Sequence, residues 1–247
     1  MKTTDDLMRL RAAYDEIRRD PPRRHSGSEF THHRILPFAT LAPWLDDGEF
    51  LALYQHIKSY TLVDLYRCYE LYCLAKQSLR VSGCFLEVGV WRGGTGALIG
   101  RVASSSGRRT YLADTFCGVV KAGDRDPRYV GGEHADTSIQ TVEYLLATLG
   151  VKNAELLSGI FPDDTGNSVT EKIAFLHCDV DVYQSARDVF EFCRPRMGVG
   201  SIVVFDDYGF FGCDGITRYV AELREDPDFV FLHNLNGHAV FIRVFEN

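Results

Sequence analysis

The stretch from Phe85 to Gly96, FLEVGVWRGGTG, decides how the rest of the chain is interpreted. It runs from apolar residues through one acidic residue into a glycine-rich turn, and then into small residues with helical character. This order is typical of a buried parallel strand whose end opens a ligand site beside the N-terminus of the next helix. An ordinary tight strand-to-helix turn has the same pattern, so the stretch by itself leaves both interpretations open.

The glycine spacing of this stretch bears on the kind of ligand. A dinucleotide enzyme would show G-x-G-x-x-G after the strand, but the pattern here is Glu-x-Gly-x-x-x-Gly-Gly, from Glu87 to Gly94. A carboxylate beside a bound pyrophosphate would be repelled by it. The same carboxylate suits a cationic nucleoside without phosphate, so S-adenosylmethionine is the cofactor that this spacing favours.

Composition and charge narrow the class of protein. The chain has 247 residues, of which 45% are hydrophobic and 25% charged, as in ordinary globular proteins. Its net charge of -7 leaves no basic field to meet phosphates, so we expect no nucleic-acid partner. The seven cysteines include several inside apolar runs and are expected to be reduced thiols. The N-terminus is polar and no apolar run reaches a membrane-spanning length, so we expect a cytoplasmic protein without a membrane partner.

The residues before the opening stretch read as a helical extension. Apolar residues at helical spacing predict a helix over 3–19, and two more helices are predicted from 46 to about 59 and from 62 to about 79. Residues 26–40 show no clear period, and we expect a mobile lid that covers a site. The many apolar positions within 50–80 indicate a subunit interface, so we also expect a homo-oligomer.

The residues after the opening stretch alternate between strand and helix patterns, which indicates a mainly parallel sheet covered on both faces. The predicted strands cover 84–88, 109–114, 154–158, 173–179, 200–206, 228–233 and 238–244. The predicted helices cover 94–105, 137–149, 183–194 and 214–225. A turn sequence at 234–237 predicts that the last two strands form an antiparallel hairpin. We therefore expect one α/β domain over 1–247, with a doubly wound, Rossmann-like sheet of seven strands over 81–247 and the helical extension over 1–80.

Ligands of such sheets bind outside the carboxyl ends of the strands. Asp114 ends the second predicted strand and is placed to bind ribose hydroxyls, although a helix cap or a turn residue would also fit there. Ser158 and Gly159 end the third strand, where two small residues let an adenine ring approach the backbone. These positions extend the predicted nucleoside site across three neighbouring strands.

Four carboxylates follow the fourth and fifth predicted strands, namely Asp179, Asp181, Asp206 and Asp207. Burying this much negative charge without a cation would cost several kcal/mol per ion. Oxygen ligands favour Mg²⁺, Mn²⁺ or Ca²⁺ over zinc. Neighbouring strand residues face opposite ways, so Asp206 and Asp207 reach one ion only if the chain turns there. The alternative is that these acids cap helices or bind water at the strand ends. That alternative accounts well for one or two of the four residues, but poorly for all four together.

Taken in order, the motifs resemble those of the macrocin O-methyltransferase (TylF/MycF/NovP) family, over roughly residues 45–245. The motifs that carry this resemblance run from Glu87 to Gly94, Asp114 to Gly118, Gly159 to Asp163, Asp179 to Ser185 and Asp206 to Tyr208. The resemblance implies the class I methyltransferase fold and an enzyme that uses S-adenosylmethionine and magnesium to methylate a hydroxyl, mostly on deoxysugars attached to antibiotics. Two departures stand out. Residues 117–120, CGVV, replace the acidic-Gly-x-Pro sequence that usually ends the motif beginning at Asp114 in this family. His177-Cys178 stands directly before Asp179, where the family frequently has Arg-Leu.

The resemblance also implies roles for particular residues. Asp179, Asp206 and Asp207 would hold the metal ion. The cofactor would contact Glu87, Gly89, Val90, Trp91, Gly93, Asp114, Ser158, Gly159 and Asp179. Asp181, close to the ion without having to bind it, is the first candidate for the base that accepts the proton of the sugar hydroxyl. His134 is the second candidate because histidine titrates in the useful range, although a surface loop residue would also fit there.

Three other functions remain to be weighed. A metal-dependent O-methyltransferase of a small catechol or phenolic acceptor would share the metal site, and an NAD-dependent sugar oxidoreductase would share the sheet. A binding protein that has lost activity would keep the fold. The missing G-x-G-x-x-G argues against the oxidoreductase, and four retained carboxylates argue against a protein without metal chemistry. The expected partner is therefore a small glycosylated natural product, whose identity the sequence leaves open.

Overall fold

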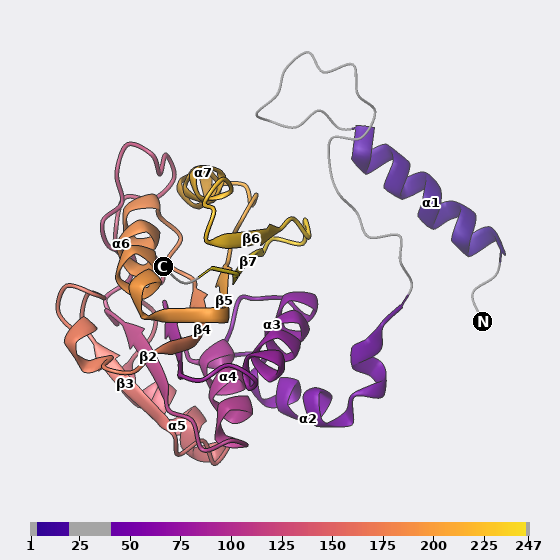
Figure 1. The fold of residues 1–247 in the computed structure, drawn as a ribbon. Coiled ribbons are helices and arrows are strands. Elements are labelled where there is room, and N and C mark those ends of the chain that lie inside the picture. The colour runs from indigo at the N-terminus through magenta and orange to yellow at the C-terminus, as the bar shows by residue number, and fades with distance from the viewer. Residues whose placement is uncertain (1–3, 20–40, 246–247) are drawn as a thin grey trace. The chain divides into compact units, whose positions relative to one another are not determined.

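The structure is a computed structural model that describes residues 4–19 and 41–245, and the chain falls into two compact units (Figure 1). The first unit covers Met1–Pro43, and its described part is essentially the helix α1 (Thr4–Arg19). The second unit covers Trp44–Asn247 and contains the sheet. The helix predicted over 3–19 is confirmed, whereas the predicted lid over 26–40 lies outside the described residues.

Within the described residues, seven strands form one sheet in the order β3-β2-β1-β4-β5-β7-β6. The strands are β1 (Cys84–Val88), β2 (Thr110–Asp114), β3 (Ala154–Ser158), β4 (Ile173–Cys178), β5 (Met197–Phe205), β6 (Phe229–Leu232) and β7 (Ala239–Arg243). Strands β1 to β5 pair in parallel, and β7 runs antiparallel to both β5 and β6. The predicted doubly wound sheet and its terminal antiparallel hairpin are confirmed.

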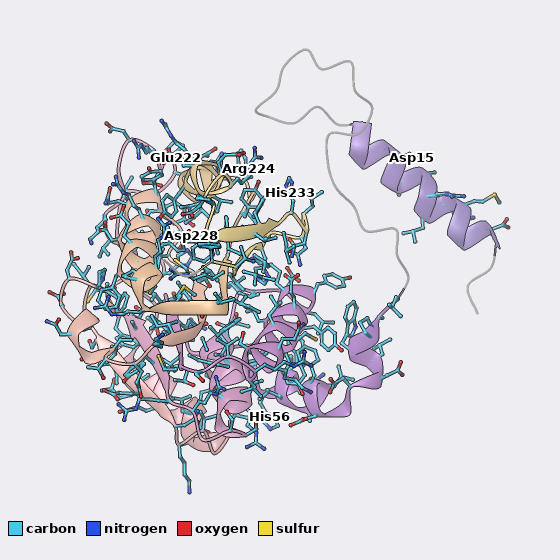
Figure 2. All side chains as sticks on the ribbon, in the orientation of Figure 1. Asp15, His56, Glu222, Arg224, Asp228 and His233 are labelled. Carbon is cyan, nitrogen blue, oxygen red and sulfur yellow. The ribbon has the colours of Figure 1, made fainter. Side chains whose placement is uncertain are left out.

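Helices cover both faces of this sheet (Figure 1). They are η1 (Pro43–Asp46), α2 (Gly48–Ile57), α3 (Leu65–Ser78), α4 (Gly94–Ser104), α5 (Ile139–Thr148), η2 (Gly166–Ser168), α6 (Tyr183–Cys193), η3 (Arg194–Arg196) and α7 (Asp214–Leu223). One core joins α2 to α5 to the face that carries Phe85, and a second joins α6 and α7 to the face that carries Leu86. Neighbouring strand residues point to opposite faces, and side chains fill the space between the sheet and the helices (Figure 2).

Two aspartates begin the helices that precede the sheet. The carboxylate of Asp47 accepts the backbone N–H of Phe50 at 2.9 Å and so caps α2, as the sequence predicts. Asp64 caps α3 by accepting the N–H groups of Tyr66 and Arg67. Helix α3 therefore begins at Leu65, three residues later than predicted, because the side chain of Asp64 replaces the missing helical acceptor.

The carboxyl ends of the central strands meet at one edge of the sheet. The backbone N–H of Asp179 donates to Val88 at 2.8 Å, and the N–H of Asp206 donates to Cys178 at 3.0 Å, so the parallel ladder continues one residue past each strand. Gly89 closes this edge at φ 88°, and a Cβ atom there would lie 1.7 Å from the carbonyl oxygen of Asp179. Only glycine allows the backbone after β1 to pass so close to the residue after β4.

Two further expectations can be compared with the described residues. All seven cysteines are free, and five of them are buried, in agreement with the expected reduced thiols. None of the described helices combines the length and the apolar character needed to cross a membrane.

Candidate functional site

A cavity of about 300 Å³ opens at this edge of the sheet. Its wall includes ten of the residues that the sequence singled out, namely Gly89, Val90, Trp91, Asp114, His134, Gly159, Asp179, Asp181, Asp206 and Asp207. Three other predicted residues, Glu87, Gly93 and Ser158, do not line it. The cavity therefore joins the predicted nucleoside site and the predicted metal site into one space.

Asp114 ties the loop after β1 to the end of β2. Its Oδ2 atom accepts the backbone N–H groups of Val90 at 2.7 Å and Trp91 at 2.9 Å, and its Oδ1 atom accepts that of Phe116 at 2.7 Å. A carboxylate offers about four lone-pair sites, so one remains for a ligand donor. Asp114 can thus accept one ligand hydroxyl in addition to shaping the loop.

The glycine-rich turn fixes the packing of α4 as well as the wall of the cavity. Gly93 precedes α4 at φ 90°, and a Cβ atom there would come within 2.9 Å of the side chain of Val142. A Cβ atom at Gly94 would lie 2.7 Å from the carbonyl oxygen of Tyr60. These two glycines allow close packing behind the cavity, and Gly93 does not contact the space where a cofactor would lie.

Glu87 lies beneath the cavity rather than in its wall. Its side chain is 0% exposed, and its Oε1 atom lies 2.8 Å from Nδ1 of His177 on the neighbouring strand β4. Burial raises the pKa of Glu87, and the neighbouring His177 opposes that shift. A Cβ atom at Gly96 would lie 2.5 Å from the other oxygen of Glu87, so the carboxylate fills the space under α4.

The carboxylates on the far side of the cavity repel one another. Burial and the charges of Asp206 and Asp181 raise the pKa of Asp207 to about 9, and its side chain is 19% exposed. Burial, followed by the neighbouring carboxylates, also raises the pKa of Asp179 well above its usual value. Burial raises the pKa of Asp181 as well. This surplus of negative charge, carried by oxygen atoms alone, fits a hard divalent cation.

The chain turns sharply at several residues of the cavity wall. Trp91, His134, Asp181 and Asp207 all have positive φ values, of 47°, 61°, 62° and 60°. Non-glycine residues rarely adopt this conformation, and such strain gathers at functional sites. The chain therefore turns at Asp207, which the sequence analysis required for Asp206 and Asp207 to reach one ion, and the shared ion itself stays a prediction.

Two groups of described residues hold ligand-type atoms within 4.8 Å of one another. One comprises Asp181, Asp207 and Cys213, and the other comprises His177, Asp206 and His238. Asp179, although it lines the same cavity, belongs to neither of these groups of described residues. The sequence predicted the three aspartates but neither Cys213 nor the two histidines as neighbours.

Tyr129 is a cavity residue that the sequence gave no reason to single out. Its hydroxyl donates a hydrogen bond to Oδ1 of Asp181 at 2.8 Å and lies 3.8 Å from Sγ of Cys213. Burial and the charge of Asp181 raise the pKa of Tyr129, so the hydroxyl keeps its proton. The ring of His134 lies 6.4 Å from that of Tyr129, between centroids, on the exposed side of the cavity.

Arg67 and two histidines surround Asp206. The guanidinium of Arg67 donates a hydrogen bond to Oδ1 of Asp206 and is held from behind by Asp64 at 2.9 Å. Burial by itself would raise the pKa of Asp206, but His238, Arg67 and His177 outweigh it and lower that pKa. Asp206 thus stays ionised, in contrast to the adjacent Asp207.

Comparisons with known proteins agree with this geometry. The sequence profile described as Macrocin-O-methyltransferase (TylF) matches residues 57–243. Over 179 residues the chain is 31% identical to the 8-demethyl-8-(2,3-dimethoxy-alpha-L-rhamnosyl)-tetracenomycin-C 4'-O-methyltransferase of Streptomyces olivaceus, and the match covers 66% of each protein. Over 171 residues it is 28% identical to the mycinamicin III 3''-O-methyltransferase of Micromonospora griseorubida, covering 63% of this chain and 67% of that protein. The chain thus spans about two thirds of the length of these relatives.

Solved structures share the fold. The O-methyltransferase NovP superposes with a TM-score of 0.67 at 22% identity, covering 75% of this chain and 83% of NovP. The calicheamicin methyltransferase CalS11 superposes with a TM-score of 0.59 at 20% identity, covering 85% of this chain and 96% of CalS11. An O-methyltransferase from Bacillus cereus in complex with SAH superposes with a TM-score of 0.54 at 16% identity, covering 82% of this chain and 96% of that protein. The predicted class I methyltransferase fold is therefore confirmed.

Proposed function

Because the chain belongs to the macrocin-O-methyltransferase (TylF) family, we propose that it transfers the methyl group of S-adenosylmethionine to a sugar hydroxyl of a glycosylated natural product. Proteins of this family and the relatives above are O-methyltransferases, a class that uses S-adenosylmethionine. The observation that carries the proposal is the shared cavity, which has the Gly89 loop and Asp114 on one side and Asp179, Asp181 and Asp207 on the other.

The loop side of the cavity would bind the methyl donor. Asp114 has one lone-pair site left for a ribose hydroxyl, and Gly89 and Gly159 expose backbone to a ligand without a side chain in the way. Asp179, ionised beside a bound metal ion, would attract the sulfonium cation. In this proposal Glu87 and Gly93 lie behind the loop, and Ser158 pairs with Asp114 at the end of β3. The contacts come from Gly89, Val90, Trp91, Asp114, Gly159 and Asp179.

The acidic side of the cavity would hold Mg²⁺ or Mn²⁺ through Asp179, Asp206 and Asp207. When bound, such an ion lowers the pKa of a coordinated hydroxyl and fixes its oxygen. Asp181 would accept the proton of the acceptor hydroxyl, because it lines the cavity and burial raises its pKa above the usual value of an aspartate, which makes it a stronger base. Tyr129 holds the Asp181 carboxylate in place by its hydrogen bond at 2.8 Å. His134 is the second candidate for this role.

The mouth of the cavity would hold the acceptor. Leu62 and Phe210 both line the cavity, and they remain 66% and 39% exposed. Exposed apolar side chains at the rim of a polar cavity suit a molecule with an apolar part and a hydroxylated part. A sugar attached to an apolar aglycone has this division.

A transfer assay with labelled methyl donor and Mg²⁺ tests the proposal. The acceptors should include several glycosylated natural products, their aglycones and simple catechols, each with and without a chelator. We expect label on the glycosylated compounds only, and we expect the chelator to abolish it. Label on catechols or aglycones alone would refute the sugar acceptor, and transfer that persists in the chelator would refute the metal requirement.

A further inference from the structure

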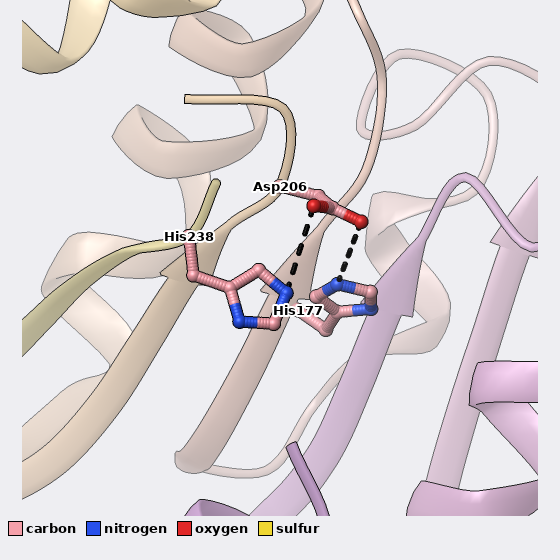
Figure 3. Close-up of side chains that lie close together, drawn as sticks. All are labelled: His177, Asp206 and His238. Atoms are coloured by element: carbon pink, nitrogen blue, oxygen red, sulfur yellow. Dashed lines mark ion pairs between the residues drawn. The ribbon is translucent and has the colours of Figure 1, made fainter. Parts of the chain in front are cut away.

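Two buried imidazoles face one carboxylate beneath the cavity (Figure 3). His177 lies on β4, His238 directly precedes β7, and Asp206 directly follows β5. The two histidines are 0% exposed and Asp206 is 2% exposed. One ligand atom from each residue lies within 4.8 Å of those of the other two. The topology of the sheet thus brings together three residues that are up to 61 positions apart (238 − 177).

Each imidazole is held through Nδ1 by its own carboxylate. Nδ1 of His177 lies 2.8 Å from Oε1 of Glu87, and Nδ1 of His238 lies 2.6 Å from Oε2 of Glu70. Because an ionised carboxylate only accepts hydrogen bonds, each Nδ1 carries a proton, so Nε2 is the ring atom that can bind a metal ion in place of a proton of its own. Metal-binding histidines are held in the same way, with the second ring nitrogen donating to a carboxylate.

Both Nε2 atoms are buried and have no hydrogen-bond partner among residues 41–245. Nε2 of His238 lies 3.6 Å from Oδ1 of Asp206, and Nε2 of His177 lies 3.9 Å from Oδ2. The Asp206 carboxylate attracts a positive charge placed at each Nε2, and either a proton or a metal ion can supply that charge. Two atoms bound to one ion at about 2.1 Å lie roughly 3.4 to 4.2 Å apart, for angles from tetrahedral to linear. The observed separations fall in this range and exceed the length of a hydrogen bond.

The charge around the imidazoles also calls for a cation. Glu70, Glu87 and Asp206 are the carboxylates that face the two rings, and the nearby cation, Arg67, is shared with Asp64. A divalent ion would offset part of the negative charge of these carboxylates. Oδ1 of Asp206, the oxygen that lies 3.6 Å from His238, already accepts hydrogen bonds from Arg67 and from the backbone of Asp207 at 2.8 Å. An ion shared by the two rings would therefore bind Oδ2, the oxygen that lies 3.9 Å from His177.

We propose that His177, Asp206 and His238 form a second cation site, which takes a divalent transition metal such as Zn²⁺. Imidazole nitrogens favour zinc over magnesium, whereas the carboxylates of the cavity above favour magnesium. The site lies under the cavity, so its ion stabilises the ends of β4 and β5 and the start of β7. Asp206 contributes to both sites, since each carboxylate oxygen has two lone pairs.

Zinc titration of the full chain tests this proposal. The protein is first treated with a chelator, dialysed into excess Mg²⁺ and then titrated with Zn²⁺ by calorimetry. We expect one equivalent of Zn²⁺ to bind in the presence of Mg²⁺ and to raise the Tm. Co²⁺ should give the visible absorption of a nitrogen- and oxygen-bound ion. Failure to bind Zn²⁺ under these conditions would overturn the proposal.

Four variants identify the site. His238→Gln and Glu70→Gln should each weaken Zn²⁺ binding by about 10- to 100-fold or more. His56→Gln, an exposed histidine of α2 (Figure 2), and Cys213→Ser, which removes the thiol of the other cluster, should bind as the unchanged chain does. If His238→Gln does not fold, Glu70→Gln decides the question, since its side chain is 25% exposed. Unchanged zinc affinity in Glu70→Gln, or loss of binding in Cys213→Ser, would refute the assignment.

Discussion

Replacing Asp207 by asparagine should stabilise the chelator-treated protein at pH 8. The carboxyl of Asp207 lies beside those of Asp206 and Asp181, and burial together with these charges raises its pKa from 3.8 to about 9. Between these two values the native protein holds a proton that the unfolded chain has released. The free energy of unfolding therefore falls as the pH rises, and it recovers as the pH is lowered below the folded-state pKa.

The size of this effect follows from one proton. The slope from this carboxyl alone is about 1.4 kcal/mol per pH unit, so Asp207 should contribute a fall of at most about 2.7 kcal/mol in the free energy of unfolding between pH 6 and pH 8. For a chain of this length that corresponds to a fall in Tm of about 5 to 10 °C. Asp207→Asn removes this contribution and should make this part of the profile shallower. Bound Mg²⁺ should flatten it in the unchanged chain, because the ion compensates the charge instead of the proton.

Thermal unfolding in a chelator, from pH 6 to pH 8, measures this dependence. Asp124→Asn is the matched control, since Asp124 is an exposed aspartate of the same chain. It should keep the slope of the unchanged protein. The reasoning fails if the unchanged chain has the same Tm at both pH values, or if Asp207→Asn loses stability as steeply as the Asp124→Asn control.

Three further substitutions test the roles of single residues. Asp181→Asn should lower kcat by about 10²- to 10⁴-fold while calorimetry shows unchanged affinity for the methyl donor, and a near-normal kcat would exclude Asp181 as the base. Asp114→Ala should weaken cofactor binding. It should also lower the free energy of unfolding in urea by about 2 to 4 kcal/mol, because three backbone N–H groups lose their acceptor. Equal cofactor affinity would contradict the ribose contact. Gly89→Ala should lower the free energy of unfolding by more than about 4 kcal/mol, because its Cβ would lie 1.7 Å from the carbonyl oxygen of Asp179. Gly123→Ala, with open space around it, should leave the stability nearly unchanged. Similar stability of the two variants would speak against this clash.

The strands were predictable because each is an apolar run that ends in an acid or a glycine. A parallel sheet buried on both faces requires such runs, and the chain order then sets which strand ends meet. The start of β5 was less visible. It begins at Met197 rather than at residue 200, because Gly198 and Gly200 interrupt the apolar run without interrupting the extended backbone.

The partners of the strand-end acids were not predictable in the same way. Arg67 comes from α3 and His238 from the start of β7, and nothing in the local sequence links either to Asp206. Glu87 was open to a better prediction. Side chains alternate between the two faces of a strand, so Glu87 points to the same face as Phe85, and α4 covers that face. The side chain of Glu87 therefore lies under the helix rather than in the ligand site.

Asp206 and Asp207 are neighbours in sequence, yet their surroundings push their pKa values in opposite directions. Asp206 points to Arg67 and the two histidines, which outweigh its burial and lower its pKa, while Asp207 turns into the cavity and has its pKa raised to about 9 by burial and by the neighbouring carboxylates. Pairs of acids whose pKa values are pushed apart in this way divide the work of a site. Asp206 provides a negative charge that persists at all working pH values, and in our proposals that charge would anchor a cation. Asp207 has to release a proton before it can coordinate a cation, so a cation that enters the cavity would displace that proton. The positive φ of Asp207 keeps its side chain directed at the space where the reaction would take place.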